Sequence, residues 1–154
     1  VRFTENILEE NKSARIEIKS FDIAECNLFE KKELNLNKKE KVTRINSIGY
    51  INNSPSVITF RSIPHDRFPK FINHFVKKQS VNKAFNLLNV KKIIRSKTLI
   101  SAEISDKIKS NLLNIDVGKP LIKTTSINVD FNKTPIELSE SYFDGSKIQI
   151  LVKV

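Results

Sequence analysis

The sequence predicts an α+β domain, built on a mostly antiparallel β-sheet flanked by helices. A length of 154 residues suits one domain. Hydrophobic residues make up 39% of the chain and include ten phenylalanines, which is enough for a packed core. Segments with strand-like alternation follow one another as hairpins and do not alternate strictly with helices. That order favours antiparallel pairing.

At the start of the chain we expect a strand between two short helices. Thr4 is a plausible N-cap of the first helix, and the acidic residue after it suits the helix dipole. Residues 14–19 alternate apolar and charged side chains, which predicts a half-buried strand. Residues 22–29 are expected to form the second helix, and a lysine-rich surface connection follows.

Residues 42–63 are expected to form a long β-hairpin around the Asn-Asn-Ser-Pro turn at 52–55. A three-residue loop pairs Ile48 with Ile58 and separates an apolar face from one that collects Ser47, Gly49, Thr59 and Arg61. A two-residue loop slips the register by one residue and mixes these groups. The cleaner separation favours the three-residue loop.

The second half of the chain continues with helices and then strands. Apolar side chains at helical spacing and serines at N-cap positions predict helices at 67–78, from Ser80 onward, and from Ser105 to Leu113. Strands are expected at 90–103, 121–131, 135–143 and 147–154, the last two flanking an Asp-Gly-Ser turn.

The composition excludes several kinds of functional site. A single cysteine rules out a disulfide framework or a cysteine-based metal cluster, and two histidines rule out a multi-histidine centre. Three glycines leave no glycine-rich phosphate loop. No apolar run approaches the roughly 18 residues of a membrane span, and the opening residues do not have the pattern of a signal peptide. Cys26, His65 and His74 lack partners at catalytic spacing and are interpreted as packing or surface residues.

The net charge of +10 has two interpretations. It fits a nucleic-acid-binding protein, and it also fits a domain that binds small anions or works beside DNA. The lysines occur in pairs along the chain without a long basic block, which is more typical of a solvated surface. Direct DNA binding by this chain therefore stays an alternative that rests on net charge alone.

Several short motifs occur in an order that resembles a known family. Their positions are Arg-Phe-Thr-Glu-Asn at 2–6, Asn-Asn-Ser-Pro at 52–55, Phe-Pro at 68–69, Gly-Lys-Pro at 118–120, Thr-Pro-Ile-Glu-Leu-Ser at 134–139 and Phe-Asp-Gly-Ser at 143–146. Together they resemble the UTRA domain, the effector-binding module of the HutC subfamily of GntR-type bacterial transcription regulators. The resemblance covers nearly the whole chain and is strongest toward the phosphonate-metabolism regulators.

The resemblance implies one UTRA-type domain over residues 1–154, with a chorismate-lyase-like fold. It implies a cytoplasmic, non-catalytic ligand sensor that uses no cofactor or metal and acts as a homodimer. DNA contact would then go only through a winged helix-turn-helix domain that lies upstream and is absent from this chain. The effector is expected to be a small anion such as a phosphonate or a phosphate ester. The strand edge at 121–131 is the expected dimer contact.

The resemblance also places the effector site. Its first part is the opening loop, where Phe3, Thr4, Glu5 and Asn6 are expected to offer backbone amides to an anion at a helix N-terminus. An ordinary capped helix is the alternative for this loop.

The second part of the expected site lies on the central hairpin. Many relatives carry two arginines and a glutamate there, where this chain has Ser47, Gly49 and Thr59. We therefore expect Arg61, on the same face, to supply the cation. Arg44 or Arg95 would replace it if the register differs.

Four further residues complete the expected site. Ser80 matches a ligand-contacting serine of the family, Glu137 is expected to accept a hydrogen bond from a hydroxyl or ammonium group, and Ser141 and Phe143 are expected to line the cavity. Each of the first two has a structural alternative, as an N-cap and as an acceptor within the sheet. Phe143 has one too, as a core aromatic. The competing function is a chorismate-lyase-like enzyme acting on a small aromatic acid, although the sequence shows no paired acid and base.

Overall fold

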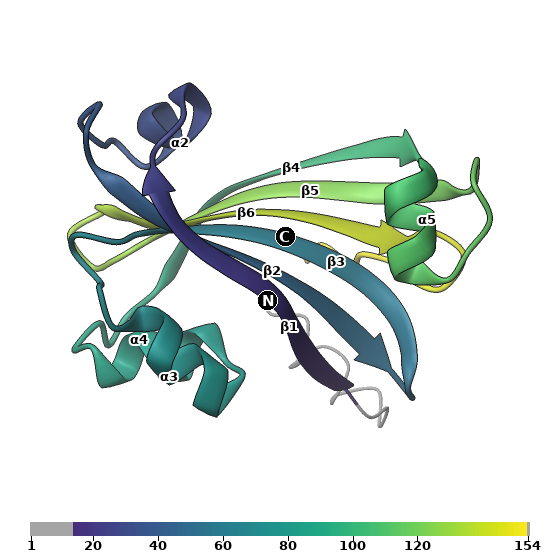
Figure 1. Cartoon of the computed structure of the whole chain (residues 1–154), viewed down its shortest axis with the longest axis horizontal. Coiled ribbons are helices and arrows are strands. Elements are labelled where there is room, and N and C mark those ends of the chain that lie inside the picture. Colours follow the sequence, from purple (N-terminus) through teal and green to yellow (C-terminus); the bar gives the residue numbers. More distant parts are fainter. Residues whose placement is uncertain (1–13, 154) are drawn as a thin grey trace.

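The described part of the chain, residues 14–153 of a computed structural model, forms one six-stranded sheet with helices on both faces (Figure 1). The strands are β1 (Ala14–Glu25), β2 (Lys41–Ile51), β3 (Ser54–Pro64), β4 (Ile94–Ile104), β5 (Pro120–Val129) and β6 (Pro135–Asp144). The helices are α2 (Leu28–Glu33), α3 (Phe71–Lys78), α4 (Val81–Leu87) and α5 (Lys107–Leu113). The strand order is β1-β2-β3-β6-β5-β4 and every pair is antiparallel, which confirms the predicted α+β class.

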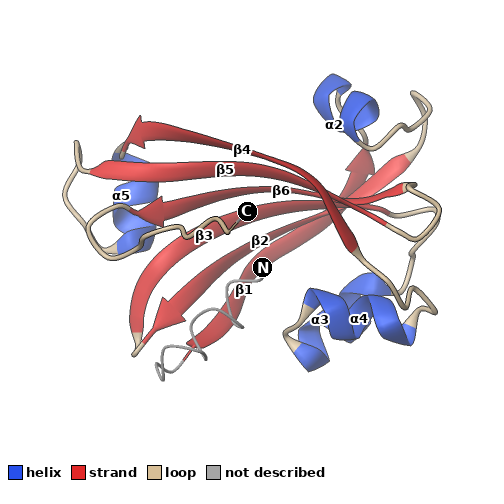
Figure 2. Cartoon of the chain, turned by 180° about the vertical axis from the view of Figure 1, so that it is seen from behind, coloured by secondary structure: helices blue, strands red, loops and turns tan. Residues whose placement is uncertain are grey.

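The helices cover different ends of the sheet (Figure 2). The α3–α4 hairpin packs on the face that carries Ile45 and Ile63. The opposite face carries Ile58, which packs against Leu113 of α5. Ile45 and Ile58 point to opposite faces because successive residues of a strand alternate and Ile58 pairs with Ile48. A third cluster joins Leu34, beside α2, to Val42 and Leu138 of the sheet. Much of the face beside the α3–α4 hairpin carries polar side chains.

The β2–β3 hairpin has the predicted register along most of its length, but its turn is different. Ile48 pairs with Ile58, as predicted. The turn contains only Asn52 and Asn53, whose φ values of 49° and 63° are typical of a two-residue type I′ turn. Ser56 is the extra residue of a β-bulge near the tip. The three-residue loop was wrong because a bulge allows a two-residue turn to keep the same separation of faces.

The predicted helix at 22–29 is wrong over most of its length. β1 runs on to Glu25, and α2 begins at Leu28 behind a capping box formed by Asn27 and Glu30. The apolar residues of this range belong to two elements, since Ile23 and Ala24 end β1 whereas Leu28 and Phe29 begin α2, and this explains the error. β1 also has a bulge at Lys19, which keeps Ile18, Phe21 and Ile23 on one face of the strand.

The other boundaries differ less. α3 begins at Phe71, β4 begins at Ile94, and Asp106, not Ser105, caps α5. Residues 147–153 form no strand, contrary to prediction. The reason is topological, because β6 already pairs with β3 on one side and β5 on the other.

The free edges of the sheet are also not where the sequence placed them. β5 lies between β6 and β4, so the segment at 121–131 cannot be an exposed edge. Within residues 14–153, the edge strands are β1 and β4. None of the helices within residues 14–153 has the length and apolar character needed to cross a membrane.

Candidate functional site

A row of polar side chains crosses the sheet on the face that carries Ile45 and Ile63. Its centre is Arg61 of β3, whose Nη1 donates to Ser47 Oγ at 3.0 Å and whose Nε donates to Glu137 Oε2 at 3.1 Å. The guanidinium carbon also lies 5.3 Å from the ring centre of Phe75 on α3. Side chains from β2, β6 and α3 therefore hold Arg61 in place.

The row continues without a break to the edge strand β4. Glu137 Oε1 accepts from Asn128 Nδ2 at 2.5 Å, and Asn128 Oδ1 accepts from Arg95 Nε at 2.7 Å. Arg95 Nη1 then donates to Ser126 Oγ at 2.9 Å. Because each group is held by the next, the orientation of every amide and guanidinium in the row is fixed.

The centre of this row is largely removed from water. The side chain of Glu137 is 2% exposed and that of Arg61 is 13% exposed. A buried ion pair is tolerated only when hydrogen bonds satisfy both partners, and the neighbouring groups supply such bonds here. The row contains two guanidinium groups, from Arg61 and Arg95, and one carboxylate. Its named side chains thus carry one net positive charge, which suits a small anion.

Two hydroxyl groups extend the polar surface beside Arg61. Thr59 of β3 and Ser141 of β6 are register neighbours, and their hydroxyl oxygens are 2.9 Å apart. Phe143 lies two residues farther along β6 and shares their face. The structure thus brings together six residues predicted for the site, namely Ser47, Thr59, Arg61, Glu137, Ser141 and Phe143.

Other predicted site residues lie elsewhere. Ser80 caps α4 by accepting from the Lys83 backbone N–H at 3.3 Å, and within residues 14–153 it makes no hydrogen bond with the polar row. Of the two alternative cations, Arg95 belongs to the row, whereas Arg44 lies on the opposite face. The opening loop, Phe3, Thr4, Glu5 and Asn6, falls outside the described residues.

The sequence interpretation missed Asn128 and Ser126, which join the two halves of the row. A signal was present, because Ser126 and Asn128 alternate with Ile127 and Val129 along β5. Such alternation marks a polar face of a strand. It does not show which strand lies beside it.

Arg44 has a structural role on the other face. It forms two hydrogen bonds with the buried Glu30 carboxylate, which also accepts from Ser62 Oγ at 2.6 Å and from the Asn27 backbone N–H. Burial alone would raise the pKa of Glu30. The bonds from Arg44, Asn27 and Ser62 outweigh that effect and lower the pKa of this carboxyl below its usual value. These contacts attach α2 to the sheet.

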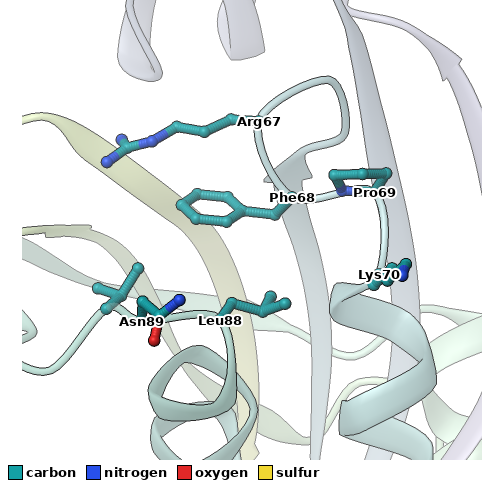
Figure 3. Close-up of a pocket in the computed structure, with 7 residues that line it drawn as sticks. Arg67, Phe68, Pro69, Lys70, Leu88 and Asn89 are labelled. Atoms are coloured by element: carbon teal, nitrogen blue, oxygen red, sulfur yellow. The ribbon is translucent and has the colours of Figure 1, made fainter.

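A shallow pocket lies away from the polar row, between the segments 67–70 and 88–90 (Figure 3). In it the Phe68 ring lies beneath the Arg67 guanidinium, 4.8 Å from ring centre to guanidinium carbon. Arg67 also forms an ion pair with Asp130. None of the predicted site residues lines this pocket, so it adds nothing to the candidate site.

A family model described as the UTRA domain matches residues 9–149. The chain belongs to the UTRA family. Among curated proteins, this UTRA domain is similar to a probable fructoselysine utilization operon transcriptional repressor of Escherichia coli K12. The two are 22% identical over 120 residues, which are 78% of this chain and 49% of the repressor. The chain therefore spans about half the length of the curated relatives it matches.

Solved structures show the same fold. The UTRA domain superposes on the effector domain of PhnF from Mycobacterium smegmatis with a TM-score of 0.87 and 15% identity, covering 99% of this chain and 94% of that one. It superposes on a GntR-family transcriptional regulator from Enterococcus faecalis V583 with a TM-score of 0.83 and 19% identity, covering 90% and 99%. These relatives and structural neighbours are transcription regulators, which favours a regulatory over a catalytic role.

Proposed function

We propose that this UTRA domain is the effector-binding part of a HutC-like, GntR-type transcription regulator. Its effector would be a small anion, such as a phosphonate or a phosphate ester. The observation that carries the proposal is the largely buried Arg61, held on the sheet face by Ser47 and Glu137. The remainder of such a regulator would include a winged helix-turn-helix domain that contacts DNA.

The surroundings of Arg61 suit a tetrahedral anion. A guanidinium forms short, charge-assisted hydrogen bonds with phosphate-like oxygens, and these are stronger where water is excluded. The hydroxyls of Ser47, Thr59 and Ser141 lie on the same face and are able to donate to the remaining oxygens. An anion at this position would share the Arg61 guanidinium with Glu137.

Glu137 narrows the chemistry of the effector. Its carboxylate repels a simple anion, but it attracts a ligand that also carries a hydroxyl or ammonium group near its negative group. We therefore propose an effector with both features. Phe143 would provide an apolar wall beside Ser141. The backbone amides of residues 3–6 and the hydroxyl of Ser80 remain predictions for the same ligand.

The test is calorimetry and thermal-shift measurement with a panel of phosphonates, phosphate esters and carboxylates at fixed salt. At least one phosphonate or phosphate ester should raise the Tm of the chain and bind saturably, and Arg61→Ala should abolish the effect. Arg44→Ala is the matched control, because it removes an Arg–Glu pair from the opposite face. If no anion stabilises the chain, or if Arg61→Ala leaves the responses unchanged, the proposal fails. Turnover of chorismate by the purified chain would favour the enzyme alternative instead.

The proposed regulator is a homodimer, and the sheet offers β4 as its contact. This edge strand exposes Leu99, Ile100 and Ile104. Antiparallel pairing of two copies centred on Ile100 would place Lys97 opposite Glu103 of the partner subunit. Both residues lie on the same face of β4, so the pairing is complementary in charge.

The polar row ends at Arg95 on this same strand. A ligand that displaces Arg61 or Glu137 would therefore disturb groups that reach the proposed dimer contact. This gives a physical route for a shift between two arrangements of the subunits. Light scattering should show a dimer that Ile100→Lys dissociates and that Ile108→Lys, at an exposed position of α5, preserves. A monomeric parent chain would contradict this contact.

A further inference from the structure

The positive charge of the chain comes almost entirely from one segment. Residues 67–102 contain nine lysines and arginines and no aspartate or glutamate. The rest of the chain contains eighteen basic and seventeen acidic residues, and is therefore nearly neutral. Basic residues occur along the whole sequence, but nearly all of their excess over acidic residues falls within residues 67–102.

Most of this segment lies outside the sheet, and the remainder is the first part of β4. The segment contains α3 and α4, which lie side by side beneath one end of the sheet, away from α5 (Figure 1). Two of its basic residues form ion pairs, Arg67 with Asp130 and Lys97 with Glu33. A third, Arg95, belongs to the polar row. The other six are exposed, and no carboxylate within residues 14–153 forms an ion pair with them; they are Lys70, Lys77, Lys78, Lys83, Lys91 and Lys92.

We propose that these six lysines form a basic surface that contacts the phosphate backbone of duplex DNA. Lysines bind phosphates as point charges and release counterions from the duplex, and this requires no base-specific geometry. The similar curated proteins are transcription regulators, so DNA is an available polyanion. The inference goes beyond the proposed effector role and does not depend on an effector being bound.

The chemistry of the surface favours DNA over an apolar partner. The large hydrophobic side chains that α3 and α4 expose, Val76 and Leu87, are each half exposed, and the exposed Phe131 ring lies beside Lys92. The segment has no carboxylate, so its lysines carry positive charge only. Such a group of lysines binds most strongly to a partner whose negative charges are dense and regularly spaced. Duplex DNA carries one negative charge for about every 1.7 Å of its axis.

The test is binding of the whole chain to a short labelled duplex of arbitrary sequence, measured by anisotropy as salt rises from about 50 mM. If all six lysines contact phosphates, log K falls with log salt with a slope of about −5. Lys77→Gln with Lys78→Gln should make that slope shallower by about 2 and weaken binding at low salt at least about tenfold. Lys91→Gln with Lys92→Gln should weaken binding and flatten the slope by the same amounts. These two residues lie outside the helices, so this variant tests the proposal even if the first variant folds poorly.

Lys38→Gln with Lys39→Gln is the matched control, because it removes the same charge from an adjacent exposed pair outside the segment. It should leave the slope unchanged. The proposal is overturned by an absence of duplex binding at low salt, or by equal weakening in the control. It is also overturned by binding to polyglutamate in preference to duplex, which would assign the surface to an acidic protein.

Discussion

Glu137→Gln tests whether the polar row is held together as the structure describes. Each oxygen of Glu137 faces a donor, Arg61 Nε on one side and Asn128 Nδ2 on the other. The amide of Gln has one oxygen, so one of these donors would face an NH₂ group. Turning the Asn128 amide does not help, because its oxygen is held by Arg95 Nε.

The size of the effect follows from burial. An unsatisfied buried donor costs about 1–3 kcal/mol, and breaking a buried ion pair costs about 3–5 kcal/mol. With Glu137 at 2% exposure and Arg61 at 13%, we expect a loss of about 3 kcal/mol in the free energy of unfolding. For a chain of this length, that lowers the Tm by about 6–12 °C.

The assay is urea unfolding at neutral pH, with the m-value checked for constancy, and a parallel thermal scan. Glu140→Gln is the control, since it makes the same substitution on the opposite face of β6, where Glu140 forms a partly exposed pair with Lys123. It should cost below about 1 kcal/mol. Equal losses in the two variants, or a loss below about 1 kcal/mol for Glu137→Gln, would refute the reasoning.

Two further substitutions test other parts of the fold. Glu30→Gln should destabilise the chain at neutral pH because it removes an acceptor from Arg44 and Ser62. Folding lowers the pKa of Glu30. The ionised carboxylate therefore contributes its full stabilisation at pH values above the pKa of the unfolded state, and this stabilisation is lost as the pH falls through the lower pKa of the folded state. The difference from the parent in urea unfolding should therefore narrow below about pH 4, and a constant difference would contradict this assignment. Gly145→Ala would place a Cβ 2.8 Å from the Pro120 carbonyl oxygen. Calorimetry should therefore show that the free energy of unfolding falls by about 1–3 kcal/mol. An unchanged Tm would show that this turn is not tightly packed.

Alternation along single strands predicted much of the candidate site. Ser47, Thr59 and Arg61 fall on one face of the hairpin in the sequence as in the structure, because the register of most of the hairpin was readable. The order of the strands in the sheet could not be predicted from these local patterns. Glu137 reaches Arg61 because β6 pairs with β3, across a long separation along the chain.

The errors have the same origin. Local patterns did not reveal the bulges at Lys19 and Ser56, each of which inserts one residue and resets the alternation. Nor did they reveal that β6 has neighbours on both sides, which leaves residues 147–153 without a strand to join. The net charge was visible, but the local patterns did not show that α3 and α4, which carry Lys77, Lys78 and Lys83, lie side by side.

The most direct measurement on the candidate site is NMR of the arginine side-chain Nε–H signals while phosphonates and phosphate esters are added. The Arg61 signal is assigned by its loss in Arg61→Lys, and the Arg44 signal in the same way. We expect the Arg61 signal to shift saturably with the anion that stabilises the chain, while the signal of Arg44, on the opposite face, does not shift. An anion that stabilises the chain without moving the Arg61 signal would contradict the account.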